Sequence, residues 1–414
     1  MTLIEFFDRA DINNIAGALA FAPHKLVLVG KGNKEMNQSV EDYRKILEAR
    51  KSGTIIEPKK VTSYKIHSIY EMLMKIAEEN EDCVFDLSGG DELFLVAVGM
   101  LYEKLGDRIQ LHRIDARKNT VIDCDEKASV VSTIPVELSV EEIVSIYGGR
   151  VVTDKEKKNG TYEWDFTEDF ICDIKKMWDI FRVDSGEWNV HINGFDAMRD
   201  KFYSDADIHL EATKSEAKDY LDKQGVKFVL TRDMCIKFVN AGLIRNYGFD
   251  RKTGRFSFDF KNDQVKRCLT KAGQLLEVYT AYVATELRRN DMDFFSDVLT
   301  GVYIDWDGKL ENEDCADVYN EVDIILMKGV VPVFVSCKAG FVKMDELYKL
   351  SSVAVRFGGP YVKKVLLCAG LFDSKKNGEY IKARADEMGI RVIDDVDEMN
   401  LSEFRKELRM IWDN

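Results

Sequence analysis

Short apolar runs alternate with helical patterns through the first 150 residues, and this alternation limits the possible folds more than any other feature of the chain. Apolar runs lie at 25–30 and 83–87, and helical patterns at 38–50 and 63–79 lie between them. Strands that alternate with helices in this way form βαβ units, in which the strands run parallel and helices cover the sheet. We therefore expect an α/β domain with a mostly parallel, Rossmann-like sheet.

The composition is that of a globular protein large enough for several domains. The chain has 414 residues, of which 45% are hydrophobic and 32% charged, so two or three domains with full cores are expected. No apolar run approaches the roughly 18 residues of a membrane span, and the start lacks the basic and then apolar order of a signal peptide. We expect a cytoplasmic protein with no membrane partner.

The net charge and the spacing of cysteine and histidine residues limit which functions and metal sites are possible. A net charge of −14 argues against a protein that coats nucleic acid, because non-specific affinity comes mainly from Lys and Arg, but it does not exclude an enzyme that acts on nucleic acid. The eight cysteines contain no C-x-x-C pair, and the five histidines are dispersed. If a metal binds, carboxylates must hold it.

Polar residues at 153–160 interrupt the pattern and predict a linker, so the first domain spans 1–152. Between 161 and 265, helical patterns precede a hairpin around 251–254, which suggests a winged-helix-like module. Because no basic recognition helix is evident, a structural connector or a dimerisation element stays open beside a nucleic-acid reader. From 266 to 414, the order of one long helix, three strands, a helix and a further strand predicts a compact α/β domain.

Two glycine-containing loops follow strands of the first domain, at the sheet edge where parallel sheets bind ligands. Backbone N–H groups in such loops can approach an anion at the start of the next helix. A tight turn and a simple helix cap are the alternatives for these loops. The predicted ligand-binding residues are Ser88, Gly89, Gly90, Asp91, Gly32 and Asn33.

A predicted hairpin in the last domain contains the residues that most clearly indicate a catalytic site. If 328–330 form its turn, Asp323 lies roughly opposite Ser336, and Lys338 shares the face of Ser336. Metal-assisted phosphodiester cleavage uses carboxylates to hold Mg²⁺ or Mn²⁺ and a lysine to orient the nucleophile or stabilise the transition state. Glu277, on the preceding long helix, is the natural second carboxylate. The alternative is a surface hairpin with an incidental salt bridge.

Asp305 and Asp307 are weaker carboxylate candidates, and the sequence around them is more typical of a turn.

The C-terminal motifs resemble the PD-(D/E)xK nuclease domain of CRISPR-associated effectors in which a CARF domain, a CRISPR-associated Rossmann-fold sensor, is joined to that nuclease. The motifs that carry this resemblance lie at 320–323, 336–338, 345–350 and 356–360, with further similarity at 4–8, 88–92 and 141–149. The resemblance implies a CARF domain, a winged-helix-like connector and a C-terminal α/β domain of the restriction-endonuclease type. It covers both ends of the chain and is thinnest in the middle.

This family implies a homodimer in type III CRISPR antiviral defence, which binds a cyclic oligoadenylate, most often cyclic tetra-adenylate, across its two sensor domains. The bound activator switches on a nuclease that uses Mn²⁺ or Mg²⁺, with single-stranded DNA or RNA the favoured substrate. By motif, Asp323 is a metal ligand, Lys338 the catalytic lysine and Glu277 the helix carboxylate. The segment 88–91 forms part of the ligand pocket.

Ser336 departs from the family pattern, because the motif usually has Asp or Glu two residues before the lysine. The serine hydroxyl can still make a direct or water-mediated contact, with Glu277 or Glu321 supplying the missing charge. This departure supports a second hypothesis, a ligand-responsive DNA-binding regulator whose nuclease-like domain is inactive.

Overall fold

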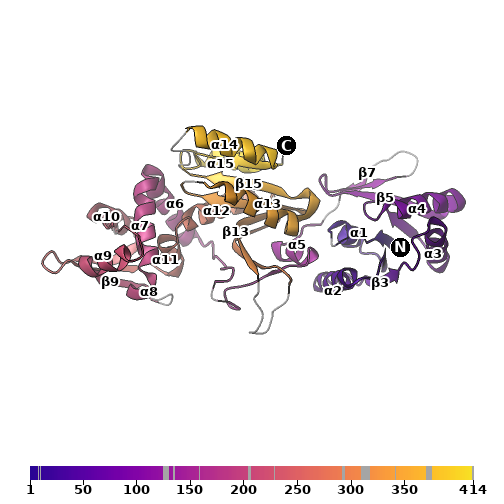
Figure 1. The fold of residues 1–414 in the computed structure, drawn as a ribbon, viewed down its shortest axis with the longest axis horizontal. Helices are drawn as coiled ribbons and strands as arrows, with labels where there is room; N and C mark the ends of the chain where they lie inside the picture. The colour runs from indigo at the N-terminus through magenta and orange to yellow at the C-terminus, as the bar shows by residue number, and fades with distance from the viewer. Residues whose placement is uncertain are drawn as a thin grey trace.

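The structure is a computed structural model that contains three sheets arranged along an elongated molecule (Figure 1). It describes residues 1–7, 9, 11–124, 130–133, 136–157, 159–203, 207–227, 229–290, 294–308, 318–340, 342–369 and 375–412. Asp8, within the 4–8 motif, lies outside this part of the chain. Among the described helices, none has the length and apolar character needed to span a membrane.

The first sheet has seven strands in the order β3-β2-β1-β4-β5-β6-β7, and its first five strands run parallel. Its strands are β1 (Thr2–Phe6), β2 (Lys25–Gly30), β3 (Ile55–Lys60), β4 (Cys83–Asp86), β5 (Ile109–Asp115), β6 (Thr120–Asp123) and β7 (Val130–Thr133). Helices α1 (Asn13–Phe21) and α2 (Lys34–Ala49) pack on one face, and α3 (Ile66–Glu79) and α4 (Glu92–Leu105) on the other. The expected Rossmann-like sheet is therefore confirmed.

The middle of the chain forms a second unit, with the order helix, strand, two helices and hairpin that defines a winged-helix-like topology. Its three strands are β9 (His209–Thr213), β10 (Ile244–Phe249) and β11 (Arg255–Phe260), with β11 between the other two. The helices are α6 (Glu168–Val183), α7 (Ser185–Ala197), α8 (Arg199–Phe202), α9 (Lys214–Asp222), α10 (Arg232–Asn240) and α11 (Asp263–Thr270). Buried aromatic side chains such as Trp188, Phe238 and Phe258 fill its core.

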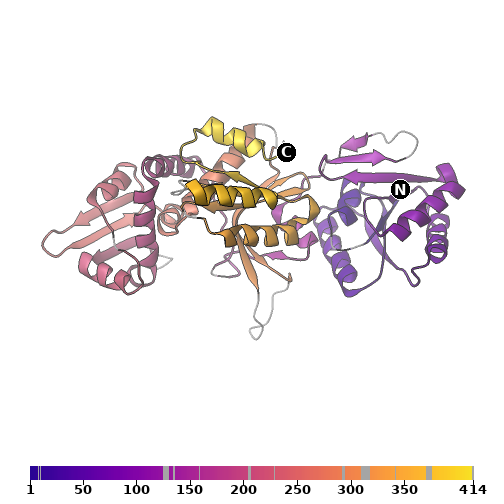
Figure 2. The same ribbon diagram turned by 45° about the horizontal axis from the view of Figure 1, so that its top comes forward.

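The third sheet has six strands in the order β16-β15-β14-β13-β12-β8 and lies between the other two units (Figure 2). The strands are β8 (Arg150–Val151), β12 (Asp297–Asp305), β13 (Tyr319–Lys328), β14 (Val331–Lys338), β15 (Lys363–Cys368) and β16 (Ile390–Ile393). Helices α12 (Gln274–Asn290) and α15 (Leu401–Arg409) pack on one face, and α13 (Met344–Gly358) and α14 (Lys375–Glu387) on the other. This arrangement agrees with the α/β layers expected for 266–414, and β8 adds a strand from the first segment.

Helix α5 (Val140–Ile146) joins the first sheet to the third. It belongs to a buried cluster that runs without interruption from α1 and α2 to α13 and β14. Just after α5, the Tyr147 carbonyl accepts a hydrogen bond from Arg356, and its hydroxyl receives one from the backbone N–H of Ile12 at 3.4 Å. Tyr147 therefore links the first sheet to the end of α13.

Replacing Gly359 with alanine is expected to destabilise this junction. Gly359 has a φ of +66°, and an added Cβ would overlap the Tyr147 ring. Gly389→Ala is the matched control, because Gly389 has a φ of +61° but no atom within 4 Å of the added Cβ. Both variants carry the backbone strain, so the extra cost of overpacking, about 1–3 kcal/mol, should lower the thermal midpoint of Gly359→Ala below that of the control. Equal midpoints would show that Tyr147 moves freely aside.

Candidate active site and ligand loops

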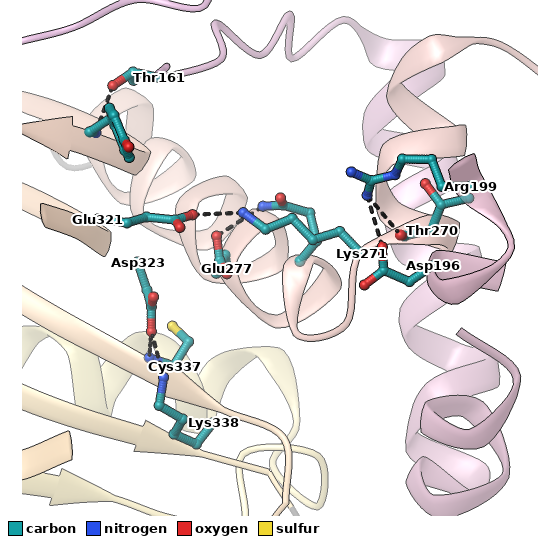
Figure 3. A network of polar contacts seen from close by, with 12 residues as sticks. Thr161, Asp196, Arg199, Thr270, Lys271, Glu277, Glu321, Asp323, Cys337 and Lys338 are labelled. Carbon is teal, nitrogen blue, oxygen red and sulfur yellow. Dashed lines mark hydrogen bonds and ion pairs between the residues drawn. The ribbon is translucent and has the colours of Figure 1, made fainter. Parts of the chain in front are cut away.

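The Asp323 carboxylate is the centre of the candidate active site. Ile324 of β13 pairs with Val335 of β14, and this register brings Asp323 next to the end of β14. Its Oδ2 accepts hydrogen bonds from the Cys337 backbone N–H at 2.6 Å and the Lys338 ammonium at 3.3 Å (Figure 3). The Ser336 hydroxyl donates to the same oxygen at 3.2 Å. The structure thus brings together the three hairpin residues that the sequence singled out.

Lys338 lies between two carboxylates. Its Nζ is 3.3 Å from Asp323 Oδ2 and 3.3 Å from Glu346 Oε2, where Glu346 comes from the first turn of α13. Burial disfavours the charged ammonium, but the two carboxylates outweigh it and raise the pKa of Lys338. Lys338 is therefore a fixed positive charge. Glu346 was not among the residues predicted from the sequence, since no spacing rule connects a helix residue to the end of a preceding strand.

Glu277 reaches the same place from α12, and Figure 3 shows it beside Glu321 and Lys271. The carboxyl is buried and accepts a hydrogen bond from Gln274 Nε2 at 2.9 Å. Burial first, and the negative charge of Asp323 second, raise the pKa of Glu277 to about 8. Lys271 pairs instead with Glu321, at 2.7 Å, and it was not among the predicted residues.

The donor set suits a hard divalent cation. No group of three or more His, Cys, Asp or Glu side chains arranged to hold a metal occurs in the described parts of the chain. Two carboxylates are nevertheless enough, because Mg²⁺ keeps several waters and binds through one or two carboxylates. The charge of Asp323 raises the pKa of Glu277, second to burial, and a divalent cation held by both carboxylates would offset this effect. The residues present therefore fit a Mg²⁺ or Mn²⁺ site formed by Asp323 and Glu277.

A cavity of about 550 Å³ opens beside this cluster and shares Lys271, Gln274 and Glu321 with it. Its walls come from the linker, α8, α11, α12 and β12, so it lies between the middle unit and the third sheet. Cationic and aromatic side chains line it together, including Arg199, Arg267, Tyr162, Trp164 and Tyr303. The lining also includes the acidic side chains Asp154, Asp263 and Glu321.

The two ligand loops flank the end of β1. Asp91 accepts a hydrogen bond from the Leu93 N–H at 3.0 Å and caps α4, and Asn33 accepts one from Met36 at 2.9 Å and caps α2. The Ser88 hydroxyl accepts a bond from Ile114 N at 2.6 Å. The helix-cap alternative therefore holds for Asp91 and Asn33, while the N-termini of both helices still face the same sheet edge.

Glycines shape both loops. Gly90 has a φ of +89°, and a Cβ there would overlap the Phe6 side chain, so the loop lies tightly against the end of β1. Gly32, with a φ of +60°, lies against the Lys60 side chain. Gly89 would place a Cβ 3.0 Å from the Phe6 carbonyl oxygen. The positive φ of Gly32 and Gly90 and the close approach of Gly89 to Phe6 explain why these positions are glycine, and the Gly32 N–H lies 3.3 Å from the Met36 sulfur.

The sequence shows no match to a family model, and no curated protein matches it. Among solved structures, protein VC1899 from Vibrio cholerae is similar over 100% of this chain and 98% of its own, with a TM-score of 0.74 and 15% identity. Can2 from Sulfobacillus thermosulfidooxidans, in complex with cyclic tetra-adenylate, covers 100% and 99%, with a TM-score of 0.67 and 16% identity. At these identities the similarity shows a shared fold, over the full length of all three chains.

A third structure, a type III CRISPR defence DNA nuclease activated by cyclic oligoadenylate, covers 90% of this chain and 46% of its own. Its TM-score is 0.49 and its identity 11%.

Two acidic residues are buried below the ligand loops. Asp86, at the end of β4, accepts a hydrogen bond from the Ser88 N–H at 2.6 Å, and burial raises its pKa to about 6. Glu5, on the neighbouring strand β1, is also buried, and burial followed by the charge of Asp86 raises its pKa well above the usual range. The Ser88 loop therefore rests on a carboxyl that is costly to ionise.

Asp86→Asn is expected to flatten the pH dependence of stability between about pH 4 and pH 7. An acid with a raised pKa in the folded state favours folding below its unfolded pKa, and this contribution is lost as pH rises through the folded value. The shift of Asp86 corresponds to up to about 3 kcal/mol. The substituted asparagine keeps an oxygen that accepts from Ser88. Thermal midpoints of wild type, Asp86→Asn and the control Asp115→Asn, measured at about pH 5 and pH 7.5, test this.

The midpoint of wild type and of the control should fall more steeply with pH than that of Asp86→Asn. Parallel pH profiles for all three proteins would contradict a buried, protonated Asp86.

Proposed function

We propose that this protein is a metal-dependent nuclease that a cyclic oligoadenylate activates, acting in type III CRISPR defence. The observation that carries the proposal is the convergence of Asp323, Lys338 and Glu277 at one end of the third sheet. The same chain shares its whole fold with Can2, whose structure contains cyclic tetra-adenylate. The chain thus combines a candidate site for phosphodiester cleavage with a fold that, in another protein, holds an oligoadenylate.

Each residue of the site has a distinct chemical task. Asp323 and Glu277 hold a divalent cation, Mn²⁺ or Mg²⁺, which when bound lowers the pKa of a water molecule and neutralises charge on the phosphate. Lys338, held by Asp323 and Glu346, directs its N–H donors at the attacking water or at the phosphoryl oxygens. Ser336 occupies the usual acidic position and contributes a hydroxyl that is hydrogen-bonded to Asp323.

The shape of the site favours single-stranded DNA or RNA as substrate. The cavity beside the acidic cluster combines Arg199, Arg267 and Lys271 with three aromatic rings. Arginine and lysine contact phosphates in any strand, but rings stack only on bases that are not already paired in a duplex. All three cations are also paired with carboxylates, Arg199 with Asp196, Arg267 with Asp263 and Lys271 with Glu321, which keeps the electrostatic attraction moderate.

Activation in this proposal requires a homodimer, in which one cyclic tetra-adenylate bridges the ligand loops of two sensor domains. Helix α4 supports such an interface, because Leu95, Val96 and Met100 are exposed on it at 39–49%. A ligand that binds the closed dimer more tightly shifts the population toward it. The continuous packing through α5 connects that change to β13 and β14.

Two features favour the second candidate, a ligand-responsive DNA-binding regulator without nuclease activity. Ser336 removes one charged ligand from the usual motif, and the middle unit has winged-helix-like topology. The two candidates differ in whether the acidic cluster cleaves a strand.

Cleavage of labelled single-stranded DNA and RNA with Mn²⁺ is expected only when cyclic tetra-adenylate is present. Lys338→Ala should reduce the rate by about 10²–10³-fold while leaving oligoadenylate binding unchanged, because the lost charge acts on the transition state. Lys349→Ala, which removes an exposed lysine that also pairs with Glu346, is the matched control and should cleave normally. Absence of cleavage with any activator or metal, together with specific duplex binding, would favour the regulator.

Ser336→Asp is expected to strengthen cation binding, because it restores a second carboxylate beside Asp323. Titration calorimetry with Mn²⁺ should show an affinity about tenfold higher than that of wild type. Ser336→Asn, similar in size but uncharged, is the control and should show no gain. If Asp and Asn behave alike, the cation is not held at this end of β14.

A further inference from the structure

A second cavity, of about 410 Å³, lies in the middle unit, between α10 and the edge strand β10. Helices α9 and α10 stand at the end of the molecule farthest from the first sheet (Figure 1), and the hairpin of β10 and β11 extends there as well (Figure 2). We call it the docking cavity; its lining includes the cations Lys214, Arg232 and Arg251 and the rings of Tyr247 and Phe249. None of these residues belongs to the candidate active site.

The charged side chains that line the docking cavity are all positive. Among the described residues, no acidic side chain lines it, although the chain as a whole has a net charge of −14. Within the same part of the chain, Lys214, Arg232 and Arg251 form no ion pair with a carboxylate. The neighbouring Asp250 is committed to its own turn, where it accepts hydrogen bonds from the Lys252 N–H and the Thr253 hydroxyl. Three cations are thus available to an anionic ligand.

The apolar part of the lining is unusually exposed. Phe249 is 38% exposed and Ile236 37%, and Lys214 Nζ lies 4.7 Å from the centre of the Phe249 ring. A register shift in β10 between Arg245 and Gly248 marks a bulge, a feature that re-aims side chains at sheet edges. Tyr247 and Phe249 are two residues apart, so their rings share one face of the edge strand. Aromatic rings beside available cations form a stacking platform for unpaired bases.

The position of the docking cavity within the middle unit also supports contact with nucleic acid. Arg232 is the first residue of α10, the second helix of the pair α9 and α10, and Arg251 lies at the tip of the β10–β11 hairpin. In helix-turn-helix modules, the N-terminal residues of the second helix contact duplex DNA, so Arg232 occupies a position at which such modules meet nucleic acid. No basic recognition helix was evident in the sequence, because these cations come from two helices and a hairpin tip rather than from one helix.

We propose that the docking cavity binds single-stranded nucleic acid at a second place on the protein, separate from the site of cleavage. Lys214, Arg232 and Arg251 contact phosphates, and Tyr247 and Phe249 stack on bases. Binding here holds a strand on the middle unit, whether or not the protein cleaves it. The assignment rests on charge, exposure and topology of the middle unit and does not depend on the proposed nuclease activity.

The test is fluorescence anisotropy with labelled oligothymidylate, the matching RNA and a DNA duplex, in EDTA so that no cleavage occurs. The docking variant is Arg232→Glu with Arg251→Glu. The matched control is Lys176→Glu with Lys218→Glu, which makes the same charge change at exposed positions of α6 and α9 outside the cavity. Thermal midpoints of both variants verify that the unit stays folded. Phe249→Ala tests the stacking contribution separately.

The docking variant is expected to bind single strands about tenfold more weakly than the control, with a salt slope lower by about 0.7 for each phosphate that the variant no longer neutralises. Phe249→Ala should weaken single-strand binding and leave duplex binding unchanged. Equal affinities for docking and control variants would overturn the proposal. A loss confined to the duplex would overturn the assignment to single strands. Lys338→Ala should lose cleavage but bind oligothymidylate as tightly as wild type, so the nuclease proposal and the docking-cavity proposal can fail independently.

Discussion

The hydrogen bonds that converge on the Asp323 carboxylate determine the geometry of the candidate site. A strand hairpin alone would leave Asp323 and Lys338 as a partly exposed pair, which contributes little to stability. Here the backbone N–H of Cys337 adds a short bond to the same oxygen, and Glu346 holds the ammonium from the other side. The carboxylate and the lysine are therefore held in place before any ligand arrives, as an active site requires.

Glu277 adds an electrostatic constraint to this geometry. Burial of its carboxyl first, and the negative charge of Asp323 second, raise the pKa of Glu277, although Lys271 and Lys338 act in the opposite direction. Burial of the ionised Glu277 carboxylate is costly unless a cation compensates it. The two carboxyls lie at the end of a sheet whose interior is otherwise packed with aliphatic side chains. The cost is consistent with a site kept for chemistry rather than for stability.

The first sheet and the third sheet are connected by direct packing and hydrogen bonds. Strand β8 pairs with β12, α5 packs between the two sheets, and Tyr147 reaches both Ile12 and the end of α13. A change at the ligand loops therefore meets a packed junction rather than a flexible tether, and densely packed interfaces switch between discrete arrangements. In the proposed function, this packing is the route by which ligand binding would be coupled to the distant cluster.

The sequence by itself determined the parallel sheet, the hairpin and the pairing of Asp323 with Ser336 and Lys338, because periodicities of two and 3.6 residues are local. It also determined the loops at 30–34 and 88–92, since turn residues act over a few positions. Only the tertiary structure decided that Glu346, Lys271 and Gln274 join the site and that β8 crosses into the third sheet. It likewise gathered Lys214, Arg232 and Arg251 around one cavity. Such contacts join residues far apart in the chain, and no local pattern specifies which buried faces meet.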